Sequence, residues 1–330
     1  MINKPISSQS KSDPNVNVII PVYNGEKVVG KAIESAFKQT YQDIVITVVD
    51  DGSTDNTLQV LAGFTGKIHI ISQANSGPSA ARNAGIRATK SEYIAFLDAD
   101  DFWLPNKLEK QMPLFKEDPD VGLVFGDISF ASSKRVLKDT SFKLVPPSKG
   151  AVFHELFKDN FIPATSVVIR RCCLDEIGLF DEEIIGPEDY DLWLRISQVW
   201  KVDYVNEPVA IYRISPGQLS ANNYRMIQQL IHVKSRIFSN YPDLSTMNQK
   251  TLEYCYYNLY TRAAKLALME NQPSKCRSYL EDYHRLKRRT YRYWLLFFAS
   301  WMPFGINQIP IKIWNRMHRQ APWEEKYREV

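Results

Sequence analysis

The sequence has little cysteine and lacks the common phosphate-binding loops. Its 330 residues include four cysteines, Cys172, Cys173, Cys255 and Cys276. None of them has zinc-ligand spacing, and four are few for a disulfide framework, so reduced thiols in a cytoplasmic setting are the simplest interpretation. No GxGxxG turn follows the first apolar run and no Walker A segment is present. These absences disfavour a dinucleotide site and a P-loop.

Long hydrophobic runs and strong charge are missing as well. No uninterrupted apolar run reaches the length of a membrane span, and the first 15 residues lack the apolar core of a signal peptide. The net charge of +4 is mild and no RNA- or DNA-binding motif is present, so nucleic acid is not an expected partner. A hydrophobic content of 44% and a charged content of 24% are typical of a globular protein with a sizeable core.

Short apolar runs alternate with helical patterns through the first hundred residues. The runs at 16–22, 44–49, 67–72 and 93–97 are predicted strands, with further strands at 121–130, 165–169, 202–205 and 209–213. The intervening helices are predicted at about 26–39, from a cap at one of residues 53–55 to about 61, and at 78–88. Residues 131–150 are mixed, with Pro146 and Pro147 marking a loop. This alternation predicts an α/β fold with a mainly parallel sheet flanked by helices. Polar segments at 21–24, 50–53, 75–77 and 98–101 follow strand ends, so we expect them to line one rim, where such sheets bind ligands.

The fourth of these segments is the acid cluster of YIAFLDADDFW, residues 93–103. Asp98, Asp100 and Asp101 are so close in sequence that their charges repel, and a cation is expected among them. Carboxylate oxygens favour Mg²⁺ or Mn²⁺. Taken alone, a solvated acidic turn that caps the helix from Pro105 is the simpler interpretation, and the remaining motifs reverse that preference.

A second acidic pair lies in GPEDYDLWLR, residues 186–195. Pro187 suits the first turn of a helix, which places Glu188 and Asp189 at the helix start. A helix N-terminus favours ionised carboxylates. Optimisation of the charge at a helix end explains the pair equally well when these residues are taken alone.

The last third of the sequence is predicted to be helical, with long helices at about 222–239, 246–270 and 273–289. A basic cluster between 285 and 292 then precedes the apolar stretch 294–304. Cations followed by aromatics are typical of a segment that lies on a membrane surface. Packing on the catalytic domain or across a homodimer is an equal alternative. We therefore expect a flexible N-terminus at 1–15, a catalytic domain at 16–217 and a helical region with a basic-aromatic tail at 218–330.

Five ordered motifs together carry a family resemblance. They are VNVIIPVYNGE, IVITVVDDGSTDNT, ANSGPSAARNAGI, YIAFLDADD and IGLFDEEIIGPEDYDLWLR, spread over residues 16–215. In this order and spacing they resemble the family 2 glycosyltransferases of bacterial polysaccharide type. The resemblance implies a GT-A Rossmann-like fold, a nucleotide-sugar donor with UDP-sugar favoured, a divalent cation such as Mn²⁺ or Mg²⁺, and inverting transfer to the hydroxyl of a glycan or lipid-linked acceptor.

The resemblance also implies roles for individual residues. Around the donor nucleotide it places Pro21, Tyr23, Asp51, Arg82 and Asp98. Asp100 is the implied direct metal ligand, with Asp98 beside it. In the second acidic pair, Asp189 is the implied general base and Glu188 supports it. The chemistry agrees, because an acceptor hydroxyl is a weak nucleophile that needs a carboxylate to take its proton.

One position departs from the family pattern. Many relatives carry a histidine two residues after the Tyr-Arg pair at 212–213, and Ser215 occupies that place here. We therefore expect no third metal ligand from this segment and a structural role for Arg213. A nucleotidyltransferase and a non-catalytic nucleotide-sugar-binding relative stay as alternatives. The expected location is cytoplasmic, with attachment to the inner face of the plasma membrane left open.

Overall fold

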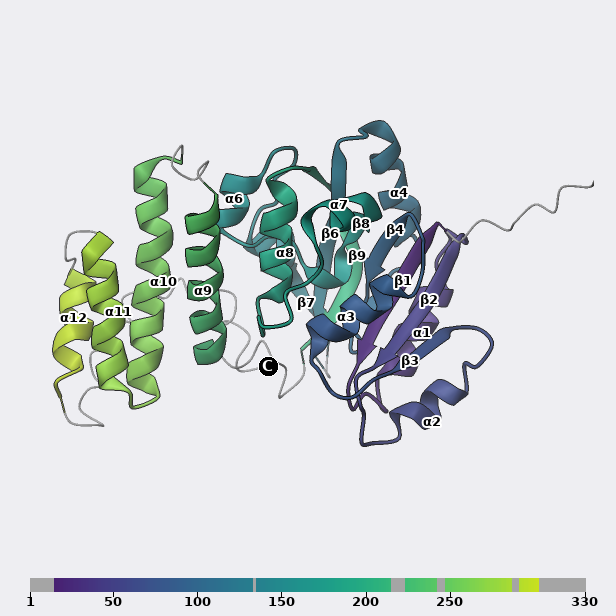
Figure 1. Ribbon diagram of the computed structural model, residues 1–330, viewed down its shortest axis with the longest axis horizontal. Helices are drawn as coiled ribbons and strands as arrows, with labels where there is room; N and C mark the ends of the chain where they lie inside the picture. The colour runs from purple at the N-terminus through teal and green to yellow at the C-terminus, as the bar shows by residue number, and fades with distance from the viewer. Residues whose placement is uncertain (1–14, 133–134, 215–222, 242–246, 287–290, 303–330) are drawn as a thin grey trace, which may run out of the picture. The chain divides into compact units, whose positions relative to one another are not determined.

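The computed structural model describes residues 15–132, 135–214, 223–241, 247–286 and 291–302 (Figure 1). It divides into two compact units. The first unit comprises residues up to 127, 163–179 and 203–212, and the second comprises 128–162, 180–202 and residues from 213 on. The predicted boundary at 217 and nearly all of the predicted flexible N-terminus lie outside the described residues, as does Ser215.

The first unit is built on a sheet in the order β3-β2-β1-β4-β8-β6-β9-β5. The ends of β6 and β9 continue into the second unit, where β7 pairs with the last residues of β6. The bounds of the strands are β1 Val16–Val22, β2 Ile44–Asp50, β3 His69–Ser72, β4 Tyr93–Phe96, β5 Phe102–Trp103, β6 Val121–Ala131, β7 Val136–Thr140, β8 Val168–Arg170 and β9 Lys201–Arg213.

The first four strands form the parallel part of the sheet, as their sequence pattern predicts. β1 pairs in parallel with β2 and β4, and β2 pairs in parallel with β3. β8 pairs antiparallel with β4, β6 pairs antiparallel with β8, and β5 pairs antiparallel with β9. The side chains of β4 are all buried and those of β1 nearly so, which explains why both read as continuous apolar runs. The expected α/β fold is confirmed.

The prediction of two separate strands at 202–205 and 209–213 was wrong. The segments 202–205 and 209–213 are one continuous strand, β9, because the polar residues between them stay extended with their side chains in solvent. Asn206 and Glu207 are exposed, and Glu207 pairs with Lys110 at 2.7 Å. The stretch 131–150 contains β7 and the short helix α5, Ser141–Leu144. The side chains of β7 are exposed or half-buried, so this strand has no apolar alternation to detect.

Five helices of the first unit are α1 Val29–Phe37, α2 Thr57–Ala62, α3 Pro78–Arg87, α4 Lys107–Glu117 and α7 Arg171–Ile177. α3 lies unusually close to β1. A Cβ added at Gly85 would be 2.6 Å from the Cγ2 of Ile19, so only glycine fits there. The buried Asn17 of β1 donates from Nδ2 to the carbonyl of Gly85 at 3.0 Å. This contact fixes the helix against the strand and thereby places Arg82, which lies one turn earlier on α3.

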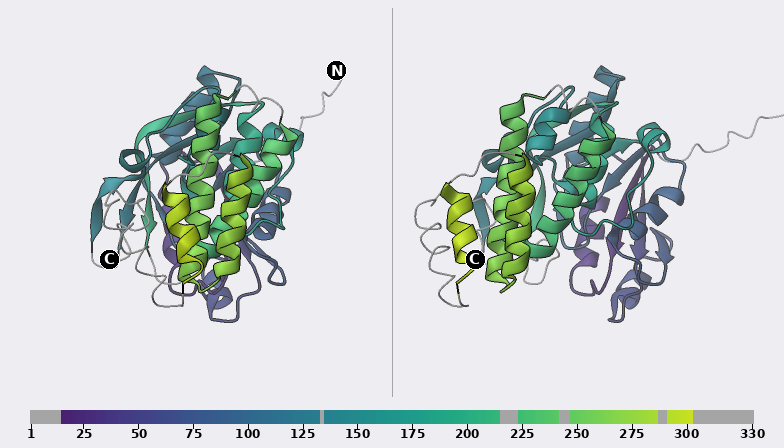
Figure 2. Two further views of the ribbon diagram at one scale, coloured as in Figure 1. Left: turned by 90° about the vertical axis from the view of Figure 1, so that its left-hand side faces the viewer. Right: turned by 60° about the vertical axis from the view of Figure 1, so that its left-hand side comes forward.

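The second unit is mainly helical. Besides α5 it contains α6 Phe153–Lys158, α8 Glu188–Ser197, α9 Asn223–Asn240, α10 Gln249–Met269, α11 Pro273–Leu286 and α12 Tyr291–Ala299. Figures 1 and 2 show α9 to α12 side by side, and α10 packs against the other three. The expected helical region is present. Among the described residues, no helix combines the length and hydropathy needed to cross a membrane.

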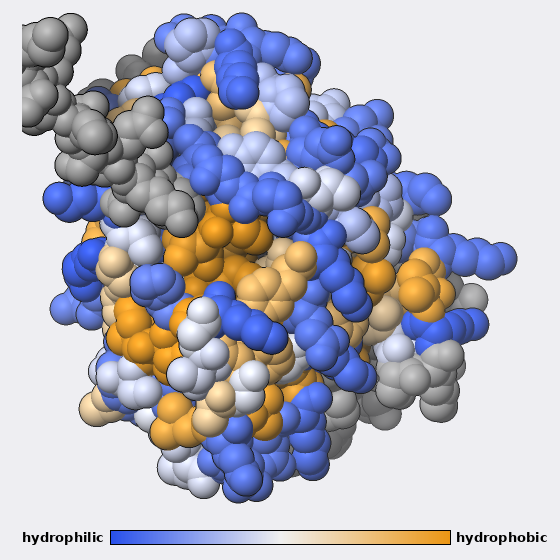
Figure 3. All heavy atoms as spheres, turned by 90° about the vertical axis from the view of Figure 1, so that its right-hand side faces the viewer, coloured by the Kyte–Doolittle hydropathy of each residue, from blue (hydrophilic) through white to orange (hydrophobic). Residues whose placement is uncertain are grey.

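The edge of the first unit's sheet carries some apolar surface. β3 has no buried side chain, and Ile70 and the nearby Phe37 are exposed. A hollow of about 460 Å³ lies beside β2 and β3, lined among others by Phe37, Ile46 and His69. Figure 3, which views the side that lies at the right in Figure 1, shows apolar side chains gathered in one area.

Candidate functional site

The ends of the parallel strands lie at one edge of the first unit. The register pairs Val22 with Asp50 and Asp50 with Ser72, so the chain leaves β1, β2 and β3 at the same level. Ile19 of β1 pairs with Phe96 at the end of β4. The polar segments that follow these strands therefore leave from one edge, where ligands of parallel sheets bind.

The loops that follow β1 and β2 are hydrogen-bonded to each other. Asn24, in a left-handed conformation with φ 51°, donates its backbone N–H to Ser53 Oγ at 2.9 Å. Its side-chain oxygen accepts from the backbone N–H of Thr54 at 2.8 Å. Gly25 N–H donates to Thr57 Oγ1 at 2.8 Å. The role of Asn24 was not predicted, although an asparagine shortly after a strand is a usual signal for a left-handed turn residue.

Asp51 organises the next loop. Its Oδ1 accepts from Gln73 Nε2 at 2.8 Å and from the backbone N–H of Ser76 at 2.9 Å, and its Oδ2 accepts from Gly77 N–H at 2.8 Å. The carboxyl group is 4% exposed. Asp51 thus ties the end of β2 to the loop that leads into α3. A carboxylate has about four acceptor positions, so roughly one is left for a donor nucleotide.

Arg82 and Asp98 form an ion pair. Arg82 Nη2 lies 2.9 Å from Asp98 Oδ1, with the arginine side chain 8% exposed and the aspartate side chain 27% exposed. The pair joins α3 to the segment that follows β4. It therefore places one cation and one anion together at the edge where the sequence predicts the nucleotide and metal contacts.

Three further predicted residues lie at or beside this edge. Asp100 is half-buried two residues beyond Asp98, in a turn closed by the bond from Asp101 N–H to Asp98 O at 2.9 Å. Pro21 is half-buried near the end of β1, and Tyr23 directly after β1 is 52% exposed. The ring of Tyr23 is accessible for stacking on a planar base.

The second acidic pair lies in the second unit, at the start of α8. Glu188 is 5% exposed, and its Oε2 accepts from the backbone N–H of Gly186 at 2.8 Å. Asp189 is half-buried, and its Oδ1 accepts from Tyr190 N–H at 2.6 Å. The two carboxylates thus differ in exposure. Glu188 is buried and accepts from a backbone N–H of the preceding loop, whereas Asp189 is in contact with solvent. Asp189 belongs to the second unit and Asp100 to the first, so their use in one site stays a prediction.

A buried network holds α8 in place. The Tyr190 hydroxyl lies 3.0 Å from the carbonyl oxygens of both Leu156 and Phe157, which ties α8 to α6. Asp191, which is 0% exposed, accepts from Arg195 Nε at 2.9 Å and also from the guanidinium of Arg236 on α9.

Arg236 makes a second ion pair, with Asp181 in the loop before α8. Partial burial alone would raise the pKa of Asp181, but the Arg236 guanidinium and the Glu183 amide hold this pKa below its ordinary value. Arg236 was not among the predicted site residues. It lies outside all five motifs, so no local signal connects it with α8.

The carboxylates of the first unit suit a hard cation. Among the described residues, no group of three His, Cys, Asp or Glu side chains could hold a metal by itself. Mg²⁺ and Mn²⁺ need only one or two carboxylates when substrate phosphates supply the other oxygen ligands. Asp100 and Asp98 are partly exposed oxygen donors at the ligand edge, so they fit a cation that arrives with a diphosphate.

Comparison with known proteins gives a consistent result. Residues 17–178 match the model of glycosyl transferase family 2. An uncharacterized glycosyltransferase of Rickettsia felis is 34% identical over 201 residues, which cover 58% of this chain and only 33% of that longer relative. The Escherichia coli protein WfgD, named UDP-Glc:alpha-D-GlcNAc-diphosphoundecaprenol beta-1,3-glucosyltransferase, is 30% identical over 218 residues, which cover 65% of this chain and 83% of the relative.

Solved structures agree on the fold. The mannosyltransferase PcManGT from Pyrobaculum calidifontis, in complex with GDP-Man and Mn²⁺, has a TM-score of 0.56 and 15% identity, covering 94% of this chain and 89% of its own. At this identity the likeness shows the GT-A fold alone. Together with the relative matched over most of its length, the comparisons establish that the chain is a glycosyltransferase and belongs to glycosyl transferase family 2.

Proposed function

We propose that this chain transfers a sugar from a nucleotide-diphosphate sugar to an acceptor hydroxyl, with inversion and with the help of a divalent cation. The single observation that carries the proposal is the parallel register, because it brings the segments with Asp51, Arg82, Asp98 and Asp100 to one ligand edge. A UDP-sugar is the first donor to test, since the WfgD name specifies UDP-Glc. Polysaccharide synthesis on a lipid-linked acceptor is the proposed setting, since the same name specifies a diphosphoundecaprenol acceptor.

Each predicted residue has a proposed task. Tyr23 and Pro21 contact the base. The Asp51 carboxylate accepts a hydrogen bond from the edge of the base at the acceptor position that Gln73, Ser76 and Gly77 leave open. When the donor binds, Arg82 contacts the diphosphate and Asp98 contacts the ribose, and their mutual ion pair is partly replaced by these contacts. A cation held by Asp100, with Asp98 beside it, would neutralise the charge that develops on the leaving diphosphate. Asp189 takes the proton of the acceptor hydroxyl, supported by Glu188, which holds the loop before α8.

We infer inversion because one base, and no enzyme nucleophile, is assigned at the second acidic pair. A single displacement needs one base and no enzyme nucleophile, whereas retention through a covalent intermediate needs a second reactive group. In the second acidic pair, Glu188 is buried and accepts from Gly186 N–H, whereas Asp189 is half-buried and in contact with solvent, so Asp189 is the carboxylate assigned to the acceptor. A nuclear magnetic resonance assignment of the anomeric proton in the product would reveal inversion or retention directly.

The metal assignment is tested by Asp100→Ala. We expect the variant to lose the increase in donor affinity that Mn²⁺ gives and at least about 100-fold in turnover, because phosphate charge is then left uncompensated. Asp43→Ala is the matched control, since Asp43 is exposed at the start of β2, at the opposite end of that strand from the ligand edge. Unchanged turnover and unchanged Mn²⁺ dependence in Asp100→Ala would refute the assignment.

The base assignment is tested separately by Asp189→Asn. The amide cannot take a proton, so turnover should fall by about 10²-fold or more while donor affinity, measured by calorimetry, stays the same. The amide oxygen can keep the bond that Asp189 Oδ1 accepts from Tyr190 N–H. Loss of donor binding together with turnover would make Asp189 a structural residue.

A further inference from the structure

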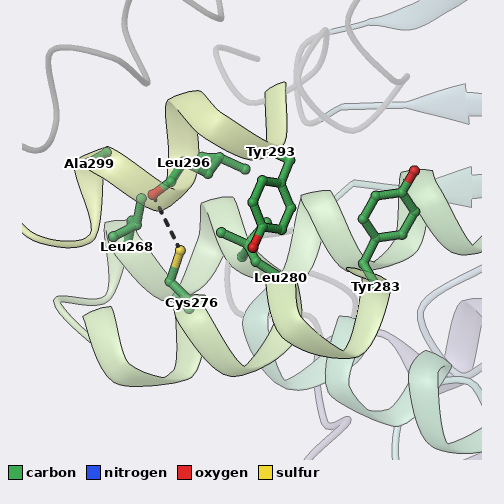
Figure 4. Packing of buried hydrophobic residues seen from close by; sticks show 9 residues of the cluster. Leu268, Cys276, Leu280, Tyr283, Tyr293, Leu296 and Ala299 are labelled. Atoms are coloured by element: carbon green, nitrogen blue, oxygen red, sulfur yellow. Dashed lines mark hydrogen bonds between the residues drawn. The ribbon is translucent and has the colours of Figure 1, made fainter. Parts of the chain in front are cut away.

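One face of α12 is packed, and its packing fixes the helix to its neighbours. Tyr293, Leu296 and Ala299 are buried in a cluster with residues of α10 and α11, among them Leu268 and Cys276 (Figure 4). The Cys276 thiol lies 3.8 Å from the carbonyl oxygen of Leu296. The helix therefore needs no further partner on this side.

The opposite face of α12 carries large apolar side chains that are exposed. Trp294 is 36% exposed, Phe298 57%, Trp301 67% and Met302 40%. Trp294 and Phe298 are four residues apart on one face of the helix, and Trp301 and Met302 lie in the turn that directly follows it. The rings of Trp294 and Phe298 stack at 5.6 Å. A contiguous aromatic stripe of this kind marks an interaction surface more often than scattered exposed residues do.

The sequence that leads into this stripe is strongly positive. Residues 273–292 include seven Lys or Arg and two Asp or Glu, a net charge of +5, whereas the whole chain carries +4. One of these cations lies at the stripe itself: the Arg277 guanidinium is 4.4 Å from the centre of the Trp301 ring, and its Nη1 donates to Ser300 O at 2.8 Å. A partner with negative charge and an apolar interior fits both properties.

We propose that Trp294, Phe298, Trp301 and Met302 form a membrane-docking face that inserts into the headgroup region of an anionic bilayer. Aromatic rings favour that region, and flanking cations attract anionic lipid. α12 has nine residues, too few to span a bilayer, so it lies in the surface. A second copy of the chain would bring the same excess of cations to the contact. The inference deepens the proposed function by naming the surface through which the enzyme meets a lipid-linked acceptor.

The chain's own residues 303–330 are the remaining candidate to cover the face. They contain five Lys or Arg and three Asp or Glu, so their net charge has the same sign as that of residues 273–292. The anionic bilayer is therefore the partner that the charges favour.

The test is vesicle flotation of the full chain. We expect it to float with vesicles that contain phosphatidylcholine and phosphatidylglycerol in equal amounts, and to stay behind with phosphatidylcholine alone. Phe298→Ser combined with Trp301→Ser should lower the partition coefficient by about tenfold or more. Phe238→Ser, which removes an aromatic ring that is 42% exposed on α9 of the same unit, should bind like the parent.

A gentler variant keeps the test decisive if the double variant does not fold. Trp301→Phe retains an aromatic ring, so it should float like the parent but show a smaller blue shift of tryptophan fluorescence on vesicle addition. Equal flotation of the double variant and the parent would overturn the proposal, as would failure of the parent to float with anionic vesicles. If sedimentation shows that the double variant dissociates a dimer of the parent while flotation is unchanged, the face belongs to a second copy. None of these measurements uses donor or turnover, so a failed transfer assay would leave their outcome intact.

Discussion

At the scale of single residues, the candidate site is made of groups that already serve the fold. Asp51 accepts three hydrogen bonds from the loop of residues 73–77, and Arg82 pairs with Asp98 across α3 and the end of β4. A group with this double use aligns the site before the ligand arrives, which lowers the ordering cost of binding. It also couples stability to function, because the same substitution changes both.

Substitution of Asp51 should show this coupling. In Asp51→Asn the amide oxygen can keep the bonds from Gln73 and Ser76, but an NH₂ group then faces Gly77 N–H. We expect a loss of about 1–3 kcal/mol in the free energy of unfolding, because a buried donor loses its acceptor, together with weaker binding of the donor nucleotide. Urea unfolding and calorimetry measure the two effects. Asp43→Asn, on the exposed start of β2, should change neither. A variant of Asp51 as stable as the parent would contradict this account.

At the scale of elements, α8 depends on residues far away in sequence. Arg236 of α9 lies 45 residues from Asp191 and 55 from Asp181, and it binds both. The loop before α8 and the helix itself are thus held by one guanidinium. The sign of the pH effect follows from the lowered pKa of Asp181: the contribution of this pair is present above the ordinary carboxyl range and is lost as the pH falls through the lowered pKa.

Arg236→Lys tests whether this arrangement positions Asp189. One ammonium group cannot make the forked contact to two carboxylates, so α8 should shift and kcat should fall by about tenfold or more. The donor KM should stay near that of the parent, because the bonds of Arg236 described here go to Asp181 and Asp191 of the second unit. Arg225→Gln, an exposed position on the same helix, is the control.

Two outcomes would contradict a positioning role. If Arg236→Lys has the parent's kcat, the network supports stability alone. If kcat and the donor KM deteriorate together, the effect is a general loss of structure. A pH profile of kcat helps to separate the cases, because a displaced base changes the profile and a smaller folded fraction only scales it.

At the scale of the whole molecule, donor and cation should stabilise the chain together. A ligand that binds only the folded state adds about 2.7 kcal/mol at 100 times its Kd. We expect the melting temperature to rise with a UDP-sugar plus Mn²⁺, and much less with either alone, because Asp100 and Asp98 are too few ligands without the phosphates. Removal of the metal with a chelator should reverse the shift. An equal rise with UDP-sugar in the absence of any metal would contradict metal-assisted binding.

Much of the fold could be predicted from the sequence because its signals are local. The four parallel strands, α3 and the helix start at Pro187 each follow from a short run of residues. The two strands predicted at 202–205 and 209–213 show the limit, since solvent-facing side chains at Asn206 and Glu207 allow an extended chain to pass through a polar segment. β7 was not predicted for a related reason: its side chains are exposed or half-buried, so its sequence shows no apolar alternation.

The sequence by itself determined which carboxylates follow which strands, and hence that Asp51, Asp98 and Asp100 leave from one edge of the sheet. Only the tertiary structure decided that Asp51 holds the loop before α3, that Arg82 pairs with Asp98, and that Arg236 reaches α8. It also decided which face of α12 is packed and which is exposed. The physical reason is that strand and helix patterns repeat over a few residues, whereas these contacts depend on how distant segments pack.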